Sequence, residues 1–409
     1  MRSHSLIPLA TAFLAAAAAS AQAPAPQTED DAYTRYELLL PVSDAKFRIL
    51  YEVTATTPGA RYFFNPIRAG SVASDERVTD RATGKPLAFE TVGDSIAKLG
   101  GVRGGDSSQK YIRVTLARPV AADGGEARLL IEKTYADPKS YYADSGGIVF
   151  DRPLGIRRNT VVLPAGYELT SCNVPSQVIR QTDGRIAISF WNDEPAAAPL
   201  VLRARAARVP AGASLSSAQS ERLDERAHQN REIVYFLRQP ETHAFDLYHD
   251  YTESRAGEST YVNVVRPGST VSEPSARDLD TGAPLKFEIL KGSALTPAKL
   301  GVPADELSGA TEAVVFHFPP VRPGASIRLR MSETYADSAR YQLVGDMLVW
   351  DRSFGRPLNA VVLPAGWILT NSSIPAVVSE MPDGRIRLDF VNPRPDDIAV
   401  LITAQRRSR

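Results

Sequence analysis

Hydrophobic side chains recur at every second position over most of this chain. Phe47, Ile49, Tyr51 and Val53 alternate with polar residues, and residues 112–116 alternate in the same way. A period of two places the apolar side chains of a strand on one face, and neither half shows the 3.6-residue period of a long amphipathic helix. Eight or more such strands in each half, separated by Pro and Gly, predict an all-β chain of antiparallel β-sandwiches.

The clearest local element is a hairpin around the Asp-Gly pair at 183–184. Glycine accepts the positive φ that tight hairpin turns require, so this pair predicts a two-residue turn between strands over 177–182 and 185–190. The same pattern recurs around the Asp-Gly pair at 383–384. The alternation in these strands predicts one buried face and one face in water, as in antiparallel sheets.

The chain repeats itself at an offset of 200. Residues 131–192 align without a gap with residues 331–392, and 26 of these 62 positions are identical. Upstream, the turn at 83–87 matches 281–285 at an offset of 198, so small insertions lie between the matched parts. A repeat of this length indicates a tandem duplication of a whole domain rather than a short solenoid unit.

These patterns divide the chain into five segments. We expect a signal peptide over 1–21, a flexible lead-in over 22–32, one β-sandwich copy over 33–208, a linker with room for a short helix over 209–231, and a second copy over 232–405. We also expect residues 32–208 and 232–409 to fold separately, since each has its own strands and is large enough to bury a core.

The first residues are typical of an export signal. A polar start with Arg2 precedes an apolar run over 6–19, and small residues around Ala21 fit a cleavage site. The run is too short to span a membrane, and no other stretch approaches 18 apolar residues, so the sequence predicts an exported, periplasmic or extracellular protein without a transmembrane segment after cleavage.

Composition narrows the function only slightly. Removal of Arg2 with the leader leaves 46 of the 47 basic residues against 47 acidic ones, which is a net charge of about −1. This balance argues against a nucleic-acid partner, which needs a basic surface. Cys172 is the single cysteine, so no intramolecular disulfide forms, and we expect it to be a half-buried packing residue.

No motif predicts a cofactor or a metal ion. The sequence has no nucleotide-binding loop, dinucleotide fingerprint or zinc-protease motif. The turn at 278–282 resembles a calcium loop, but its counterpart at 80–84 lacks the second acid, and we interpret both as β-turns. All histidines outside the leader lie beyond the first copy, and we expect them to be structural or surface residues: His228, His243, His249 and His317.

The strongest polar candidates are duplicated. In each copy a Tyr-Ala-Asp ends one strand and an aromatic-Asp-Arg triplet follows; the residues of this candidate cluster are Tyr135, Asp137, Asp151, Arg152, Tyr335, Asp337, Trp350, Asp351 and Arg352. Acids with arginine and aromatics serve sugar binding or acid–base catalysis, but they also form structural ion pairs and turn caps. We expect the structural use, with Asp351 and Arg352 forming a shielded pair.

The order of strands, the Leu-Pro-Ala-Gly-aromatic turns at 163–167 and 363–367 and the later Asp-Gly hairpins resemble the non-catalytic β-domain that precedes the zinc domain of M1-type aminopeptidases. The resemblance implies a β-sandwich fold for each copy. It implies no site residue, because the zinc-bearing domain of that family has no counterpart in this sequence.

The sequence therefore favours an exported, non-catalytic binding or scaffolding protein with a protein or carbohydrate ligand. One alternative is a glycan-binding protein that uses aromatics near the strand ends, namely Tyr135, Tyr141, Tyr142, Tyr167, Tyr335, Tyr341, Trp350 and Trp367. Another is a hydrolase with paired aspartates, Asp137 with Asp151 or Asp337 with Asp351.

Overall fold

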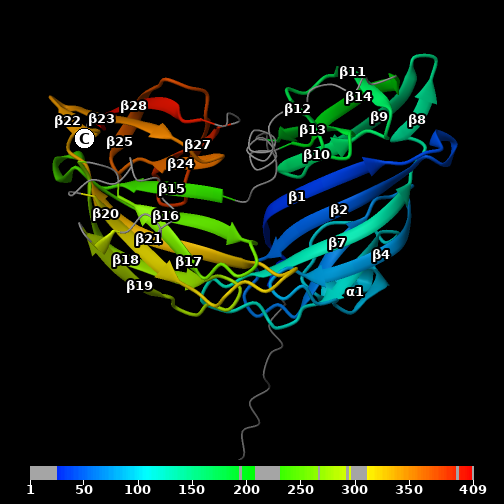
Figure 1. Cartoon of the computed structure of the whole chain (residues 1–409), viewed down its shortest axis with the longest axis horizontal. Helices are drawn as coiled ribbons and strands as arrows, with labels where there is room; N and C mark the ends of the chain where they lie inside the picture. The colour runs from blue at the N-terminus through cyan, green and yellow to red at the C-terminus, as the bar shows by residue number, and fades with distance from the viewer. Residues whose placement is uncertain are drawn as a thin grey trace, which may run out of the picture.

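The computed structural model describes residues 25–192, 196–207, 231–265, 268–291, 294–295, 311–392 and 396–407. Almost all regular structure in these residues is β, as the alternation predicts, and the two halves are joined at one end (Figure 1). The expected signal peptide and the expected linker helix lie outside the described residues. None of the helices in the described part is long and apolar enough to cross a membrane.

Each half is built on a seven-stranded sheet. The two sheets have the same strand order when equivalent strands are compared. In the first half the order is β12 (Gln177–Arg180), β13 (Ile186–Trp191), β10 (Arg158–Val162), β1 (Glu29–Leu38), β2 (Lys46–Ala55), β7 (Ala127–Ala136) and β4 (Val72–Asp80). In the second it is β26 (Val377–Glu380), β27 (Ile386–Val391), β24 (Leu358–Val362), β15 (Arg231–Leu237), β16 (Ala244–Glu253), β21 (Ile327–Ala336) and β18 (Thr270–Asp278).

Two smaller sheets accompany each large sheet. The four-stranded sheets are β11 (Tyr167–Cys172), β14 (Ala198–Ala206), β9 (Gly147–Leu154) and β8 (Tyr141–Asp144), and then β22 (Tyr341–Val344), β23 (Met347–Phe354), β28 (Ile398–Arg406) and β25 (Trp367–Ser372). The three-stranded sheets are β3 (Tyr62–Ile67), β6 (Lys110–Thr115) and β5 (Phe89–Gly93), and then β17 (Thr260–Val264), β20 (Glu312–His317) and β19 (Lys286–Lys291). Short helices η1 (Val42–Asp44), α1 (Asp94–Leu99) and η2 (Pro240–Thr242) connect strands.

The core of the first half lies between the large sheet and both small ones. Phe47 and Ile131 from the large sheet pack in one cluster with Phe63 of β3, Phe150 of β9 and Leu202 of β14. The second half repeats this arrangement with two clusters, one beneath each small sheet. Each half is therefore a sandwich in which two small sheets share one face of a large, curved sheet.

Two details differ from the sequence-based expectation. Strand β1 pairs with β10 in parallel, and β15 pairs with β24 in parallel, so the large sheets are mixed rather than purely antiparallel. The Asp-Gly hairpins have three-residue loops, because Gln181 N–H donates to the Arg185 carbonyl and Gly184 sits at φ +82°. Glycine occupies the left-handed position that closes such a loop, so the predicted two-residue turn is wrong by one residue.

A buried polar network, which we call the joint, links the halves. Arg128 of β7 donates two hydrogen bonds of 2.7 Å to the carboxylate of Asp280 in the second half, and its guanidinium also bonds to Ser326. In the reverse direction, Arg328 Nε of β21 lies 3.0 Å from Glu126 Oε2 of the first half. Arg128 and Arg328 are equivalent at the 200-residue offset, but their acids are not, because Ala82 stands at the position equivalent to Asp280.

Backbone contacts tighten the joint. Glu126 N–H donates to the Leu279 carbonyl at 2.7 Å, and Ser326 N–H donates to the Arg81 carbonyl at 3.1 Å. Gly84 lies against Gly324 so closely that a Cβ would be 2.8 Å from the Gly324 carbonyl oxygen. The turns that make these contacts are β-turns capped by their own side chains, as expected: Thr83 Oγ1 donates to Asp80, and Thr281 Oγ1 donates to Asp278, each at 2.6 Å.

Candidate functional site

The first copy of the predicted polar cluster is a saturated turn cap. Asp137 follows β7, and its Oδ2 accepts hydrogen bonds from Ser140 Oγ at 2.8 Å, Arg152 Nη1 at 3.0 Å and Ser71 Oγ at 3.1 Å. Burial raises the pKa of Asp137, but the hydroxyls of Ser140 and Ser71 and the charge of Arg152 outweigh it, so the pKa lies below its ordinary value. The Arg152 guanidinium also lies 5.6 Å from the ring centre of Tyr135.

The second copy repeats this cap. Asp337 Oδ2 accepts hydrogen bonds from Arg352 Nη1 at 2.9 Å and from Ser269 Oγ at 3.0 Å. The Arg352 guanidinium lies 5.3 Å from the ring centre of Trp350, which is fully buried. Both caps hold the chain where it leaves the large sheet and turns into the four-stranded sheet.

Asp151 and Asp351 lie apart from these caps. Each directly precedes the arginine of its cap on a strand, so its side chain points to the opposite face and is exposed while the arginine is buried. The expected pair of Asp351 with Arg352 is therefore wrong, because the partner of Arg352 is Asp337. The hydrolase alternative requires the two aspartates of a copy to face one another. In each half one of them is buried in the cap and the other is exposed on the opposite face of its strand.

The predicted aromatic residues are mostly core residues. Six of the eight rings proposed for sugar stacking are buried: Tyr135, Tyr141, Tyr335, Tyr341, Trp350 and Trp367. A ring buried on both faces cannot form the exposed platform that sugars stack on. Residues of the described part also contain no group of three or more His, Cys, Asp or Glu that could hold a metal ion.

The histidines of the described part lie in separate places. His249 is buried beside Tyr261, whose hydroxyl is 3.2 Å from Nδ1, and burial lowers its pKa well below the ordinary value. His243 Nδ1 is 2.9 Å from the Tyr341 carbonyl oxygen, and His317 lies 3.1 Å from Glu288. His228 lies outside the described residues.

One buried pair of positions was missed by the sequence reasoning. Lys133 and Glu333 are equivalent, and they carry opposite charges inside otherwise apolar faces. Lys133 Nζ donates to Asn65 Oδ1 at 2.5 Å, and burial together with the Arg152 charge lowers its pKa to about 8. Burial raises the pKa of Glu333 to about 7, although a hydrogen bond from Asn263 Nδ2 at 2.6 Å favours the charged form. The alignment of the two halves shows opposite charges at these equivalent positions, and this pattern could have identified them.

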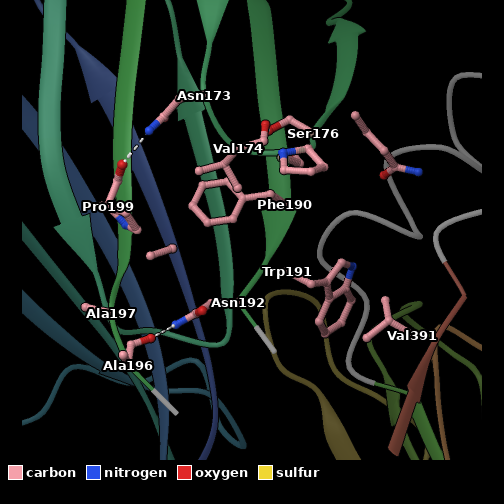
Figure 2. Close-up of a pocket in the computed structure, with 14 residues that line it drawn as sticks. Asn173, Val174, Ser176, Phe190, Trp191, Asn192, Ala196, Ala197, Pro199 and Val391 are labelled. Carbon is pink, nitrogen blue, oxygen red and sulfur yellow. Dashed lines mark hydrogen bonds between the residues drawn. The ribbon is translucent and has the colours of Figure 1, made fainter. Parts of the chain in front are cut away.

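The structure places a pocket elsewhere, in a groove between the two halves. A pocket of about 720 Å³ is lined mainly by apolar side chains of the first half, including Phe190 and Trp191, and by Val391 of the second (Figure 2). Two amides brace its wall, since Asn173 Nδ2 donates to the Pro199 carbonyl at 2.7 Å and Asn192 Nδ2 to the Ala196 carbonyl at 2.9 Å.

A second pocket of about 660 Å³ continues this groove into the second half. It shares Trp191, Asn192 and Val391 with the first and adds Arg157 and strand β26. Trp191 and Val391 are at equivalent positions in the 200-residue offset, so the groove lies where the two halves face each other. Trp191 is half-buried and β13 carries it to this position. We call the two pockets together the inter-copy groove.

Comparison with known proteins supports only the fold-level resemblance. No family model and no curated protein matches the chain. An aminopeptidase N family protein from Idiomarina loihiensis matches with 9% identity and a TM-score of 0.27, over 42% of this chain and 29% of that one.

An M1 zinc metallopeptidase from Deinococcus radiodurans matches with 12% identity and a TM-score of 0.29, over 49% of this chain and 53% of that one. A two-domain M1 zinc metallopeptidase bound to L-tryptophan matches with 14% identity and a TM-score of 0.27, over 48% and 52%. The chain thus spans about half the length of these proteins, or less. The predicted weak resemblance to M1-type aminopeptidases is confirmed, at the level of the fold alone.

Proposed function

We infer that this chain is an exported, non-catalytic binding protein and that its ligand occupies the inter-copy groove. The observation that carries this proposal is the pair of continuous pockets on either side of Trp191, about 720 and 660 Å³. Volumes of roughly 300–1,000 Å³ with mostly apolar walls and a few fixed polar groups are typical of small-ligand sites. The leader sequence supports export, which N-terminal sequencing of secreted protein tests by locating the cut after Ala21.

Trp191 offers a direct readout of groove occupancy. The other two tryptophans, Trp350 and Trp367, are buried with exposed fractions of 0% and 2%, so a ligand in the groove changes mainly Trp191 emission. We expect the amphiphilic dye 1-anilinonaphthalene-8-sulfonate, whose aromatic rings suit an apolar pocket, to quench Trp191 saturably by energy transfer.

Two variants locate the dye. Trp191→Ala should weaken its binding about tenfold, because a half-buried aromatic wall of the site is lost. Trp367→Phe, which alters a tryptophan away from the groove, should leave the dye affinity unchanged. Binding that is insensitive to Trp191→Ala, or an absence of dye binding to the folded chain, would contradict the assignment of the groove.

A further inference from the structure

The open edge of strand β26 forms one wall of the inter-copy groove. β26 is the last strand of its sheet and pairs with β27 on one side only. All four of its residues are exposed, with Val377 at 39% and Val378 at 51%, and Val377, Val378 and Ser379 line the 660 Å³ pocket. An unpaired edge presents backbone N–H and C=O groups that another extended chain can pair with.

The equivalent strand of the first half, β12, is also the last strand of its sheet, but its side chains are less exposed than those of β26. Ile179 of β12 is buried, and Gln177 is already engaged in a contact. The groove therefore offers the edge of β26 on the second half, facing apolar surface from the first.

The opposite wall supplies a cation. Arg157 follows β9 and lines the same pocket as β26, and its guanidinium forms no hydrogen bond or ion pair with the described residues. The other arginine of the pocket, Arg387, is neutralised by Asp389 at 2.7 Å and by Glu232 at 3.3 Å. Among the described residues that line this pocket, Arg157 is the cation without a paired acid, and its charge is complementary to a carboxylate.

We propose that the inter-copy groove binds an extended peptide segment that adds a strand to the edge of β26 and places a carboxylate on Arg157. This inference rests on the proposed function and names its ligand class. Backbone hydrogen bonds to β26 supply affinity, while alternate side chains of the peptide enter the apolar pocket beside Trp191. Four residues of edge span about 13 Å, which suits a peptide segment of similar length.

The test uses the full chain, Trp191 fluorescence and synthetic peptides. The probe is an acetylated, amidated octapeptide with valine at alternate positions and one central aspartate. It should quench Trp191 saturably. Two matched peptides, one with lysine in place of aspartate and one N-methylated at alternate residues, should bind at least tenfold more weakly. The first loses the carboxylate and the second loses the backbone donors.

Protein variants complete the design. Arg157→Ala should weaken the aspartate peptide roughly ten- to a hundredfold, the range for a charge-assisted hydrogen bond. Arg322→Ala is the matched control, because Arg322 is exposed, forms no side-chain bond with the described residues and lines a different pocket, and it should leave affinity unchanged.

The outcomes distinguish the peptide inference from the proposed binding function of the groove. Equal binding of the aspartate, lysine and N-methylated peptides, or no effect of Arg157→Ala, overturns the peptide inference. If the anilinonaphthalene dye or decanoate quenches Trp191 and the aspartate peptide does not, the groove remains a binding site and the peptide inference falls. If no probe quenches Trp191, both the peptide inference and the proposed function fall.

Discussion

At the scale of single residues, Lys133 and Glu333 show how the two halves differ within their cores. Each lies on a buried face at equivalent places in β7 and β21, and each bonds to the equivalent asparagine, Asn65 or Asn263. The asparagine amide can accept from an ammonium through its oxygen or donate to a carboxylate through its nitrogen. The same geometry in the two halves therefore accommodates either charge.

The buried ammonium of Lys133 should make stability depend on pH. Its folded pKa of about 8 lies below the ordinary 10.5, so the folded chain holds fewer protons than the unfolded chain between these values, and stability rises with pH there. Between pH 7.5 and 9.5 this single group should add about 2 kcal/mol to the free energy of unfolding. Urea melts over this pH range should show this rise in the free energy of unfolding for the wild type, and Lys133→Met should lack it.

The exposed Lys139 provides the control for that comparison. Lys139→Met should retain the wild-type dependence on pH, because Lys139 lies in a turn at the surface. An identical slope in wild type and Lys133→Met would show that Lys133 is not held in a low-polarity environment.

At the scale of elements, the two caps hold the junction between the large and the four-stranded sheet of each half. In each cap, an arginine on β9 or β23 reaches back to the aspartate that follows β7 or β21. The four-stranded sheet contributes Phe150 or Trp350 next to this arginine, and these rings pack on Phe47 or Phe245 of the large sheet. Electrostatic and apolar contacts thus meet at one point of each sandwich.

Asp337→Ala and Asp351→Ala should separate the buried partner from its exposed neighbour. Asp337→Ala leaves the buried Arg352 without its carboxylate and should lower the free energy of unfolding by about 3–5 kcal/mol. Asp351→Ala removes an exposed carboxylate that forms no side-chain bond with the described residues, and it should change stability by less than about 0.5 kcal/mol. Denaturant melts measure both. The reverse order of effects would contradict the assignment of Asp337 as the partner.

At the scale of the whole molecule, the joint pairs buried charges of one half with buried charges of the other. The joint buries Arg128, Glu126, Asp280 and Arg328, which are charged and come from both halves. Burial raises the pKa of Glu126 to about 7, although the charge of Arg328 opposes this. The expectation that residues 32–208 and 232–409 fold separately stays a prediction, but the joint implies that each half alone exposes groups that are paired in the full chain.

Asp280→Ala tests this coupling. It leaves Arg128 of the first half without its carboxylate partner, so β7 should lose protection even though the substitution lies in the second half, with a cost of about 3–5 kcal/mol. Hydrogen exchange of the β7 amides measures the loss. Asp383→Ala, in the hairpin at the opposite end of the same large sheet, removes only an exposed contact with Arg385 and should leave β7 unchanged. Unaltered β7 exchange in Asp280→Ala would indicate that the halves are energetically independent.

The period-two pattern, the repeat and the glycine turns determined the strands, their buried faces and the equivalence of the halves, because these features depend on residues close in sequence. Which groups meet was decided by the tertiary structure. Alternation showed that Arg352 and Asp351 face opposite ways only once the strand bounds were known, and the partner, Asp337, lies across a turn. The joint and the inter-copy groove join residues more than 100 positions apart, as Arg128 with Asp280 shows. Such contacts depend on how the curved sheets of the two halves pack together. A local pattern of polar and apolar residues does not determine that packing.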